Sequence, residues 1–237
     1  GLVASVPLLV LAQSAGAIMM VVPCVGIILA VMLTERLTGM QKVFLAVCGL
    51  IGTAAFALFL MTNGETLLAD ILTSSGKDAT LTGRTDLWAI GLSFIAERPL
   101  QGLGYRAFWV PGFAPAEQLW AMFLVPSGAG FNFHNTYISN AVEIGLVGLG
   151  LQVFIIYGGA ILMTVYALAR PTAENAFLLG MQVLLILRSF IEVEVFFEFS
   201  VRSILAVATF VYAAHGLAML MRSAPSSVPR RQPSPPA

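Results

Sequence analysis

The chain reads IGLVGLGLQVFIIYGGAILMTVYAL from Ile144 to Leu168, without a single charged residue. A helix needs about 20 apolar residues to cross the hydrocarbon core of a bilayer. Together with the residues from Tyr137 onward, this stretch predicts a membrane-spanning helix over Tyr137–Leu168. Four other segments are apolar enough for the same interpretation, and they cover about Val6–Leu33, Val43–Met61, Ala176–Ile191 and Val201–Met221. We therefore expect an all-α polytopic membrane protein with about five transmembrane helices.

The composition supports this class. Hydrophobic residues make up 58% of the chain and charged residues 10%, whereas about a quarter of the residues of a soluble domain are charged. Twelve Lys and Arg balance twelve Asp and Glu, so no basic field exists to attract nucleic acid. Cys24 and Cys48 both fall in apolar runs, which is typical of buried free thiols. Neither a metal motif nor a nucleotide-binding motif is present, and we expect no metal and no cofactor.

The short connections between the expected spans predict the orientation. They carry the basic residues, and five crossings place all of these connections on one side of the membrane. That side is cytoplasmic by the positive-inside rule. The basic residues are Arg36, Lys42, Arg170, Arg222, Arg230 and Arg231.

The same reasoning divides the chain into four parts. Residues 1–61 form two transmembrane helices, residues 62–136 an extracytoplasmic loop, and residues 137–222 three more transmembrane helices. Residues 223–237 are rich in Pro and Ser and form a disordered cytoplasmic tail. In a bacterium this places the protein in the inner membrane with the long loop in the periplasm.

The first apolar run is interpreted as a true span. No basic segment precedes it, and it is too long for the apolar region of a signal peptide. Because the chain opens on Gly1 directly before a span, we expect it to be the C-terminal portion of a larger protein.

The long loop is where we expect the chemistry. A short amphipathic helix is predicted to begin with Thr82 as its N-cap and to end before Pro99. It is too short and too charged to span, so it should lie at the membrane interface or pack against the bundle. The stretch 102–130 mixes Gly, Pro and aromatic residues, which predicts a structured loop near the headgroups.

Arg84 falls in the first turn of that loop helix. A cation there opposes the helix dipole, where an acid is normally favoured. Free backbone N–H groups beside an arginine suit a phosphate or diphosphate. The alternative is a solvated arginine paired with Asp86 or Asp78.

His134 lies in Phe-Asn-Phe-His-Asn-Thr-Tyr, directly before the third expected span. The positive end of that helix disfavours imidazolium, and a neutral histidine near the outer surface can accept a proton from a sugar hydroxyl. The alternative is a capping or interfacial role, because Asn135 and Thr136 also cap helices.

Glu143 lies a turn or two inside the third span, where an ionisable group is costly and needs a partner. Arg106 and Arg188 are the candidate partners, and a structural ion pair is favoured over direct catalysis. Arg188 also belongs to a charged cluster at the turn between the last two spans, which could line a polar cavity. The other members of that cluster are Glu192, Glu194, Glu198 and Arg202.

The order of these motifs resembles the O-antigen ligase/polymerase superfamily, the Wzy-like proteins. The sequence Asp78-Ala-Thr-Leu-Thr-Gly-Arg-Thr-Asp-Leu-Trp88 is followed by Glu97-Arg-Pro-Leu-Gln-Gly-Leu-Gly-Tyr-Arg-Ala-Phe-Trp109. Then come His134-Asn-Thr-Tyr-Ile and Glu143-Ile-Gly-Leu-Val-Gly148. The resemblance is strong over about residues 75–150 and is closest to the exopolysaccharide polymerase branch, the ExoQ type.

The resemblance implies a GT-C-like glycosyltransferase that polymerises oligosaccharide repeats carried on undecaprenyl diphosphate. Arg84 would bind the lipid diphosphate and His134 would act at the acceptor hydroxyl, by inversion and without a metal. Substrate contacts are expected from Arg106, Arg188, Glu143 and Asn135. The expected partners are the lipid-linked donor, the acceptor glycan, and other polysaccharide export and chain-length proteins.

Two alternatives stay open. A ligase uses the same donor and moves the glycan to lipid A core or to protein. A transporter or an assembly subunit would perform no chemistry, and its polar residues would line a path. Transporters usually place their sites at the midplane between broken helices, whereas the polar residues here collect at one surface.

Overall fold

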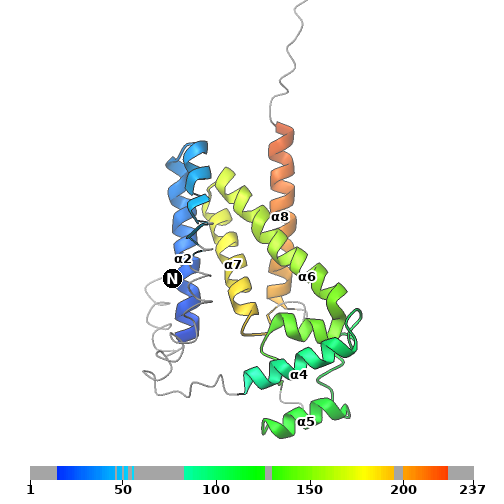
Figure 1. Ribbon diagram of the computed structural model, residues 1–237. Helices are drawn as coiled ribbons and strands as arrows, with labels where there is room; N and C mark the ends of the chain where they lie inside the picture. Colours follow the sequence, from blue (N-terminus) through cyan, green and yellow to red (C-terminus); the bar gives the residue numbers. More distant parts are fainter. Residues whose placement is uncertain are drawn as a thin grey trace, which may run out of the picture.

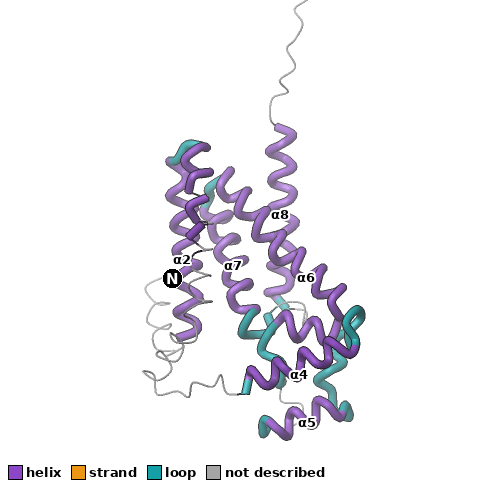
Figure 2. Tube along the Cα trace, viewed as in Figure 1, coloured by secondary structure: helices purple, strands orange, loops and turns teal. Residues whose placement is uncertain are grey.

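The computed structural model describes residues 15–45, 47–49, 51–52, 55, 83–125, 130–194 and 200–223. Within these ranges the chain is all-helical and contains no strand (Figures 1 and 2). The elements are α2 (Ala15–Leu33), a short 3-10 helix η1 (Thr34–Arg36), α4 (Arg84–Glu97), α5 (Ala114–Met122), α6 (Thr136–Ala169), α7 (Ala173–Ser189) and α8 (Val201–Ser223).

Helices α2, α6, α7 and α8 pack into a bundle that forms the body of the described structure. Helix α6 packs against α7 and α8, and α2 packs on α7 (Figure 1). Small residues allow close approach, as is usual between membrane helices: Gly159 faces Phe210 of α8, and Gly180 faces Ile28 of α2. The main buried cluster consists of Val31, Met163, Ala167, Ala176, Leu179 and Ala213.

Helices α6 and α8 are long and apolar enough to cross a membrane. Large apolar side chains such as Phe154, Ile161 and Phe177 are more than half exposed on the surface of the bundle, as side chains in contact with lipid would be. The first and fourth expected spans correspond to α2 and α7, which are helices. Much of the second expected span, about Val43–Met61, lies outside the described residues.

The connections expected on one side of the membrane lie at one end of the bundle. The ammonium group of Lys42 donates to the carbonyl of Leu168 at 2.8 Å, which joins the segment after α2 to the end of α6. The C-terminal end of α8 lies at the same end, and α4 and α5 lie at the opposite end (Figure 1). The bundle thus has a connection end and a loop end.

The loop end has its own aromatic core. Phe108 and Phe133 are fully buried with ring centroids 4.9 Å apart, and Trp120 of α5 is also buried among them. Helix α4 packs on α6, as the prediction that it packs against the bundle requires. Helix α5 was not expected from the sequence.

The start of α4 differs from the prediction. Its N-cap is Gly83, which lies in the left-handed region with φ 75° and offers no side-chain cap. The expected cap by Thr82 is therefore wrong. A Cβ atom at Gly83 would overlap the ring of Phe123, so close packing rather than capping selects the residue at this position.

Helix α6 is broken at Gly145, whose φ of 67° and ψ of −178° are accessible essentially to glycine alone. The break releases backbone groups, and the turn after α4 satisfies them. The N–H groups of Leu103 and Gly104 donate to the carbonyls of Val142 and Glu143 at 2.9 and 2.8 Å. The polar backbone inside an apolar helix is thereby paired, as burial demands.

Candidate active site

The turn that follows α7 holds the N-terminus of α6. Asn135 is the N-cap, and its side-chain oxygen accepts two backbone N–H groups of the first turn at 2.9 and 3.1 Å. Its amide nitrogen donates to the carbonyl of Phe190 at 3.1 Å. The hydroxyl of Thr136 donates to the carbonyl of Glu192 at 2.7 Å and accepts the N–H of Glu194 at 2.9 Å. Three hydrogen bonds thus fix the 190–194 turn beside residues 135–136.

His134 occupies the position before this cap in a left-handed conformation, with φ 49°. Its backbone N–H donates to the side-chain oxygen of Asn132 at 2.7 Å. A non-glycine residue with positive φ is strained unless its surroundings hold it. Here the buried Phe133 on one side and the cap on the other hold it. The ring nitrogen Nδ1 lies 3.4 Å from the carboxylate of Glu192.

Arg84 reaches the same turn from the first residue of α4. Its Nη1 donates to the carbonyl of Ile191 at 3.1 Å, and its Nη2 lies 3.6 Å from the carboxylate of Glu192. Helix α4 is oriented for this by Trp88, whose indole N–H donates to the carbonyl of Phe133 at 2.8 Å. Among the described residues the charged partner of Arg84 is therefore Glu192. Of the two partners expected from the sequence, Asp78 lies outside the described residues.

Arg84, His134 and Glu192 together form the side-chain cluster that we take as the candidate active site. A pocket of about 190 Å³ adjoins it. The cluster joins a permanent cation, an imidazole and a carboxylate that are all partly exposed. Such a set can bind an anion and move a proton. The pocket is lined by Gly83, Arg84, Leu87, Phe123, Phe131 and His134.

Glu143 lies elsewhere, at the break in α6. Its side chain is buried, and one carboxylate oxygen accepts the backbone N–H of Arg106 at 2.6 Å. Arg106 itself has a positive φ of 56°. Of the two partners expected for Glu143, the structure selects Arg106, through its backbone.

Arg188 instead pairs with Glu194. The distance is 2.7 Å, and Arg202 of α8 lies 2.7 Å from the other oxygen of the same carboxylate. Only 1% of the Glu194 side chain is exposed, whereas both arginines are more than a third exposed. Three members of the charged cluster expected between the last two spans therefore meet, and their centre is a buried acid held by two cations. Glu198 lies outside the described residues.

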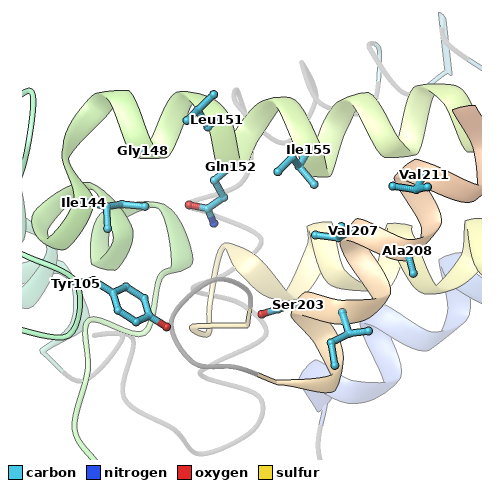
Figure 3. Close-up of a pocket in the computed structure, with 11 residues that line it drawn as sticks. Tyr105, Ile144, Gly148, Leu151, Gln152, Ile155, Ser203, Val207, Ala208 and Val211 are labelled. Atoms are coloured by element: carbon cyan, nitrogen blue, oxygen red, sulfur yellow. The ribbon is translucent and has the colours of Figure 1, made fainter.

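A wide apolar groove of about 930 Å³ runs between α6 and α8 (Figure 3). Gln152 is 3% exposed, and neither its amide nitrogen nor its amide oxygen has a hydrogen-bond partner among the residues that the structure describes. Figure 3 shows its side chain leaving α6 toward α8. Tyr105 and Ser203 are the other polar residues of the wall. The groove is separate from the Arg84 pocket, since the two share no lining residue.

The family model described as O-antigen ligase matches residues 1–153, which include α4 and the N-terminal half of α6. The chain belongs to the O-antigen ligase family. It is also 35% identical over 211 residues to the exopolysaccharide production protein ExoQ of Rhizobium meliloti (strain 1021). The matched region covers 88% of this chain and 48% of that relative. The chain thus spans about half the length of the curated relative it matches. No solved structure matches the chain.

Family membership, with two helices of spanning length, makes this a membrane protein. Of the site residues predicted from the O-antigen ligase resemblance, the structure brings together Arg84, His134 and Asn135. Arg106 and Glu143 lie together at the break in α6. Arg188 lies apart from both groups, in the last turn of α7, where it pairs with Glu194.

Glu192 is the residue that sequence reasoning missed as part of the site. The sequence places Glu192 in the charged cluster at the turn between the last two expected spans, without a role of its own. It also lies beyond the part of the chain that matches the O-antigen ligase model. Its sole sequence signal is an acid between two apolar residues at the end of a span.

Proposed function

We propose that this protein is a membrane glycosyltransferase that polymerises undecaprenyl-diphosphate-linked oligosaccharide repeats into exopolysaccharide at the extracytoplasmic face. The observation that carries the proposal is the meeting of Arg84 and His134 at one carboxylate beside a small pocket. The family match and the printed name of the Rhizobium meliloti relative support a role in polysaccharide synthesis.

In the proposed step, an acceptor hydroxyl attacks the anomeric carbon of the donor while the carbon–oxygen bond to the diphosphate breaks. The electron pair of that bond leaves with the diphosphate, and the hydroxyl proton passes to His134. Because Nδ1 of His134 faces Glu192, Nε2 is the atom that takes the proton. Arg84 stabilises the charge that develops on the leaving diphosphate. A single displacement inverts the anomeric carbon, and it needs no metal.

The other predicted site residues have two kinds of role in the proposal, direct binding of the substrate or support of the backbone around it. Arg188 and Arg106 are the additional cations for diphosphate or for acidic sugars. The side chain of Asn135 caps α6 and donates to the carbonyl of Phe190. The carboxylate of Glu143 accepts the backbone N–H of Arg106. We therefore propose that these two support the substrate through the backbone they hold.

The lipid part of the substrate needs an apolar surface. The groove between α6 and α8 has nearly all-apolar walls on helices of spanning length (Figure 3), which suits an isoprenoid chain. We propose that it receives this chain. We also propose a GT-C-like arrangement of five spans, one of them the second expected span at about Val43–Met61, with the C-terminus in the cytoplasm.

The test is turnover by the full-length protein in detergent, supplied with a lipid-diphosphate oligosaccharide and EDTA. We expect chain growth on the lipid with inverted anomeric configuration. Arg84→Ala and His134→Ala should each slow it at least about 100-fold, the usual scale for loss of an acid–base group. If both variants polymerise at the wild-type rate, the assignment is wrong.

The same assay separates the two alternatives. A ligase would transfer the glycan to lipid A core or protein and leave no long repeats on the carrier. A transporter would leave the donor intact in detergent, where no gradient exists. The clustering of cation, base and carboxylate at the loop end of the bundle favours an enzyme.

A further inference from the structure

The carboxylate of Glu192 lies between the two groups to which the proposed function gives separate tasks. One oxygen is 3.6 Å from Nη2 of Arg84, and the other is 3.4 Å from Nδ1 of His134. Arg84 is assigned to the donor diphosphate and His134 to the acceptor hydroxyl. A single side chain therefore contacts both halves of the reaction.

Both contacts are long. Aligned charge-assisted hydrogen bonds measure about 2.7–2.9 Å, and Glu194 on the same turn reaches 2.7 Å to each of its arginines. The two acids also differ in burial. The side chain of Glu192 is 37% exposed, whereas that of Glu194 is 1% exposed. Glu194 is fixed, whereas Glu192 is held loosely by each partner and is accessible to a competing anion.

The backbone beneath Glu192 does not need to move for its side chain to change partner. The carbonyl of Glu192 accepts the hydroxyl of Thr136 at 2.7 Å, and the carbonyl of Ile191 accepts Nη1 of Arg84 at 3.1 Å. Nη1 of Arg84 thus stays bound to the turn, while Nη2 is available to exchange the carboxylate of Glu192 for another anion.

We propose that Glu192 is an internal anion that occupies Arg84 until the donor diphosphate replaces it, and that it then turns fully to His134. A diphosphate offers more charge and better fork geometry to arginine than a carboxylate does. Released from Arg84, Glu192 accepts the Nδ1–H of His134 and leaves Nε2 free for the acceptor proton. Glu192 is a positioning residue, and it couples occupation of the donor site to readiness of the base. This inference rests on the proposed function.

The coupling predicts opposite effects on binding and turnover. Glu192→Gln keeps the shape and removes the charge, so the diphosphate has no internal competitor. The donor KM and the Kd for inorganic pyrophosphate should fall about two- to five-fold, the scale of a partly exposed ion pair. The kcat should fall about ten-fold or more, because His134 loses its orienting carboxylate. A merely structural role would weaken binding and turnover together.

The first experiment measures pyrophosphate binding to the full-length protein in detergent with EDTA, and so does not depend on turnover. Wild type, Glu192→Gln, Arg84→Ala and the matched control Glu35→Gln are compared. Glu35 is an exposed acid on η1, at the far end of the bundle. We expect tighter binding for Glu192→Gln, loss of binding for Arg84→Ala, and no change for Glu35→Gln. Equal or weaker binding by a folded Glu192→Gln overturns the inference.

A second variant separates charge from packing within one folded protein. Glu192→Cys, in a background without Cys24 and Cys48, is alkylated either with iodoacetate or with iodoacetamide. The two products differ only in carrying a carboxylate or an amide. The carboxylate form should bind pyrophosphate more weakly and turn over faster than the amide form. Identical behaviour of the two forms contradicts the inference.

Turnover measurements then distinguish failure of the role of Glu192 from failure of the proposed polymerase function. If wild type polymerises the lipid-linked donor and Glu192→Gln shows unchanged KM and kcat, the inference fails and the proposed function stands. If wild type leaves the donor intact while Glu192→Gln still binds pyrophosphate more tightly, the polymerase proposal fails. In that case the internal-anion part of the inference remains.

Discussion

Arg84 opens α4, at the end of a helix where the dipole disfavours a cation. The carbonyl of Ile191 and the carboxylate of Glu192 offset this with two contacts to different guanidinium nitrogens. Lysine carries its charge on a single nitrogen, so it cannot present two separate nitrogens to these partners as the planar guanidinium does. Position 84 thus requires the fork as well as the charge.

The first prediction follows for Arg84→Lys. Loss of one charged hydrogen bond is worth about 1.5–3 kcal/mol, so kcat/KM for the lipid-linked donor should fall about 10- to 100-fold. The matched control is Arg98→Lys at the other end of the same helix, where the arginine is exposed; it should retain wild-type turnover. If Arg84→Lys is as active as Arg98→Lys, the guanidinium fork has no role.

The second prediction concerns His134, whose φ of 49° limits which substitutions the fold accepts. Asparagine tolerates the left-handed region well and cannot act as a base. His134→Asn should therefore unfold within about 2 °C of wild type and lose about 10²- to 10⁴-fold in kcat. His215→Asn, an exposed histidine of α8, should change neither quantity. A His134→Asn variant that is active would remove the histidine from the mechanism.

At the scale of elements, the break in α6 and the turn after α4 form one unit. Gly145 and Gly102 both have φ 67°, and each packs directly on the backbone of the other segment. A Cβ atom at Gly145 would overlap the carbonyl of Leu100, and one at Gly102 would lie 2.5 Å from the carbonyl of Glu143. The two glycines allow the backbone of the turn to enter the broken helix.

The third prediction is that Gly145→Ala destabilises the protein. Strain in this backbone region is about 1–3 kcal/mol, and steric overlap adds about as much again. The thermal unfolding midpoint in detergent should fall by about 5 °C or more. Gly112→Ala is the control, since Gly112 also has positive φ but no atom of the described residues lies within 4 Å of its Cβ position. Equal midpoints for the two variants would show that backbone contact at Gly145 contributes nothing.

At the scale of the whole molecule, the bundle separates a loop end with α4 and α5 from a connection end with η1 (Figure 1). The candidate active site lies at the loop end. The short connections at the other end carry Arg36, Lys42 and Arg170, and on the positive-inside rule we propose that this end faces the cytoplasm. Substrate and site would then meet on the extracytoplasmic side.

The fourth prediction tests this sidedness in intact cells. In a background without native cysteines, Gln118→Cys in α5 should react with a membrane-impermeant maleimide. Glu35→Cys in η1 should react only after the cells are lysed. Both positions are exposed, so burial does not explain a difference. The reverse pattern of labelling would invert the topology and exclude an extracytoplasmic active site.

The sequence predicted some elements closely and missed others for identifiable reasons. The third span was expected at Tyr137–Leu168, and α6 covers Thr136–Ala169, because a long apolar run flanked by polar residues leaves little choice of boundary. Helix α5 has only nine residues and lies among Gly, Pro and aromatics, so its periodicity is too short to detect. Thr82 fits an N-cap by residue type, but the packing of Phe123 on Gly83 decided where α4 begins.

What the sequence determined alone was the helical membrane class, and it also predicted the polar loop and named Arg84 and His134 as candidate site residues. These follow from local quantities: hydropathy, helix ends and the order of short motifs. Tertiary structure alone decided that Glu192 stands between them and that Arg188 belongs to Glu194. The physical reason is that the energy of an ion pair depends on the distance between the charged groups and on their burial, and both are set by the fold. The turn after α7 reaches the start of α6 through hydrogen bonds between residues more than fifty positions apart.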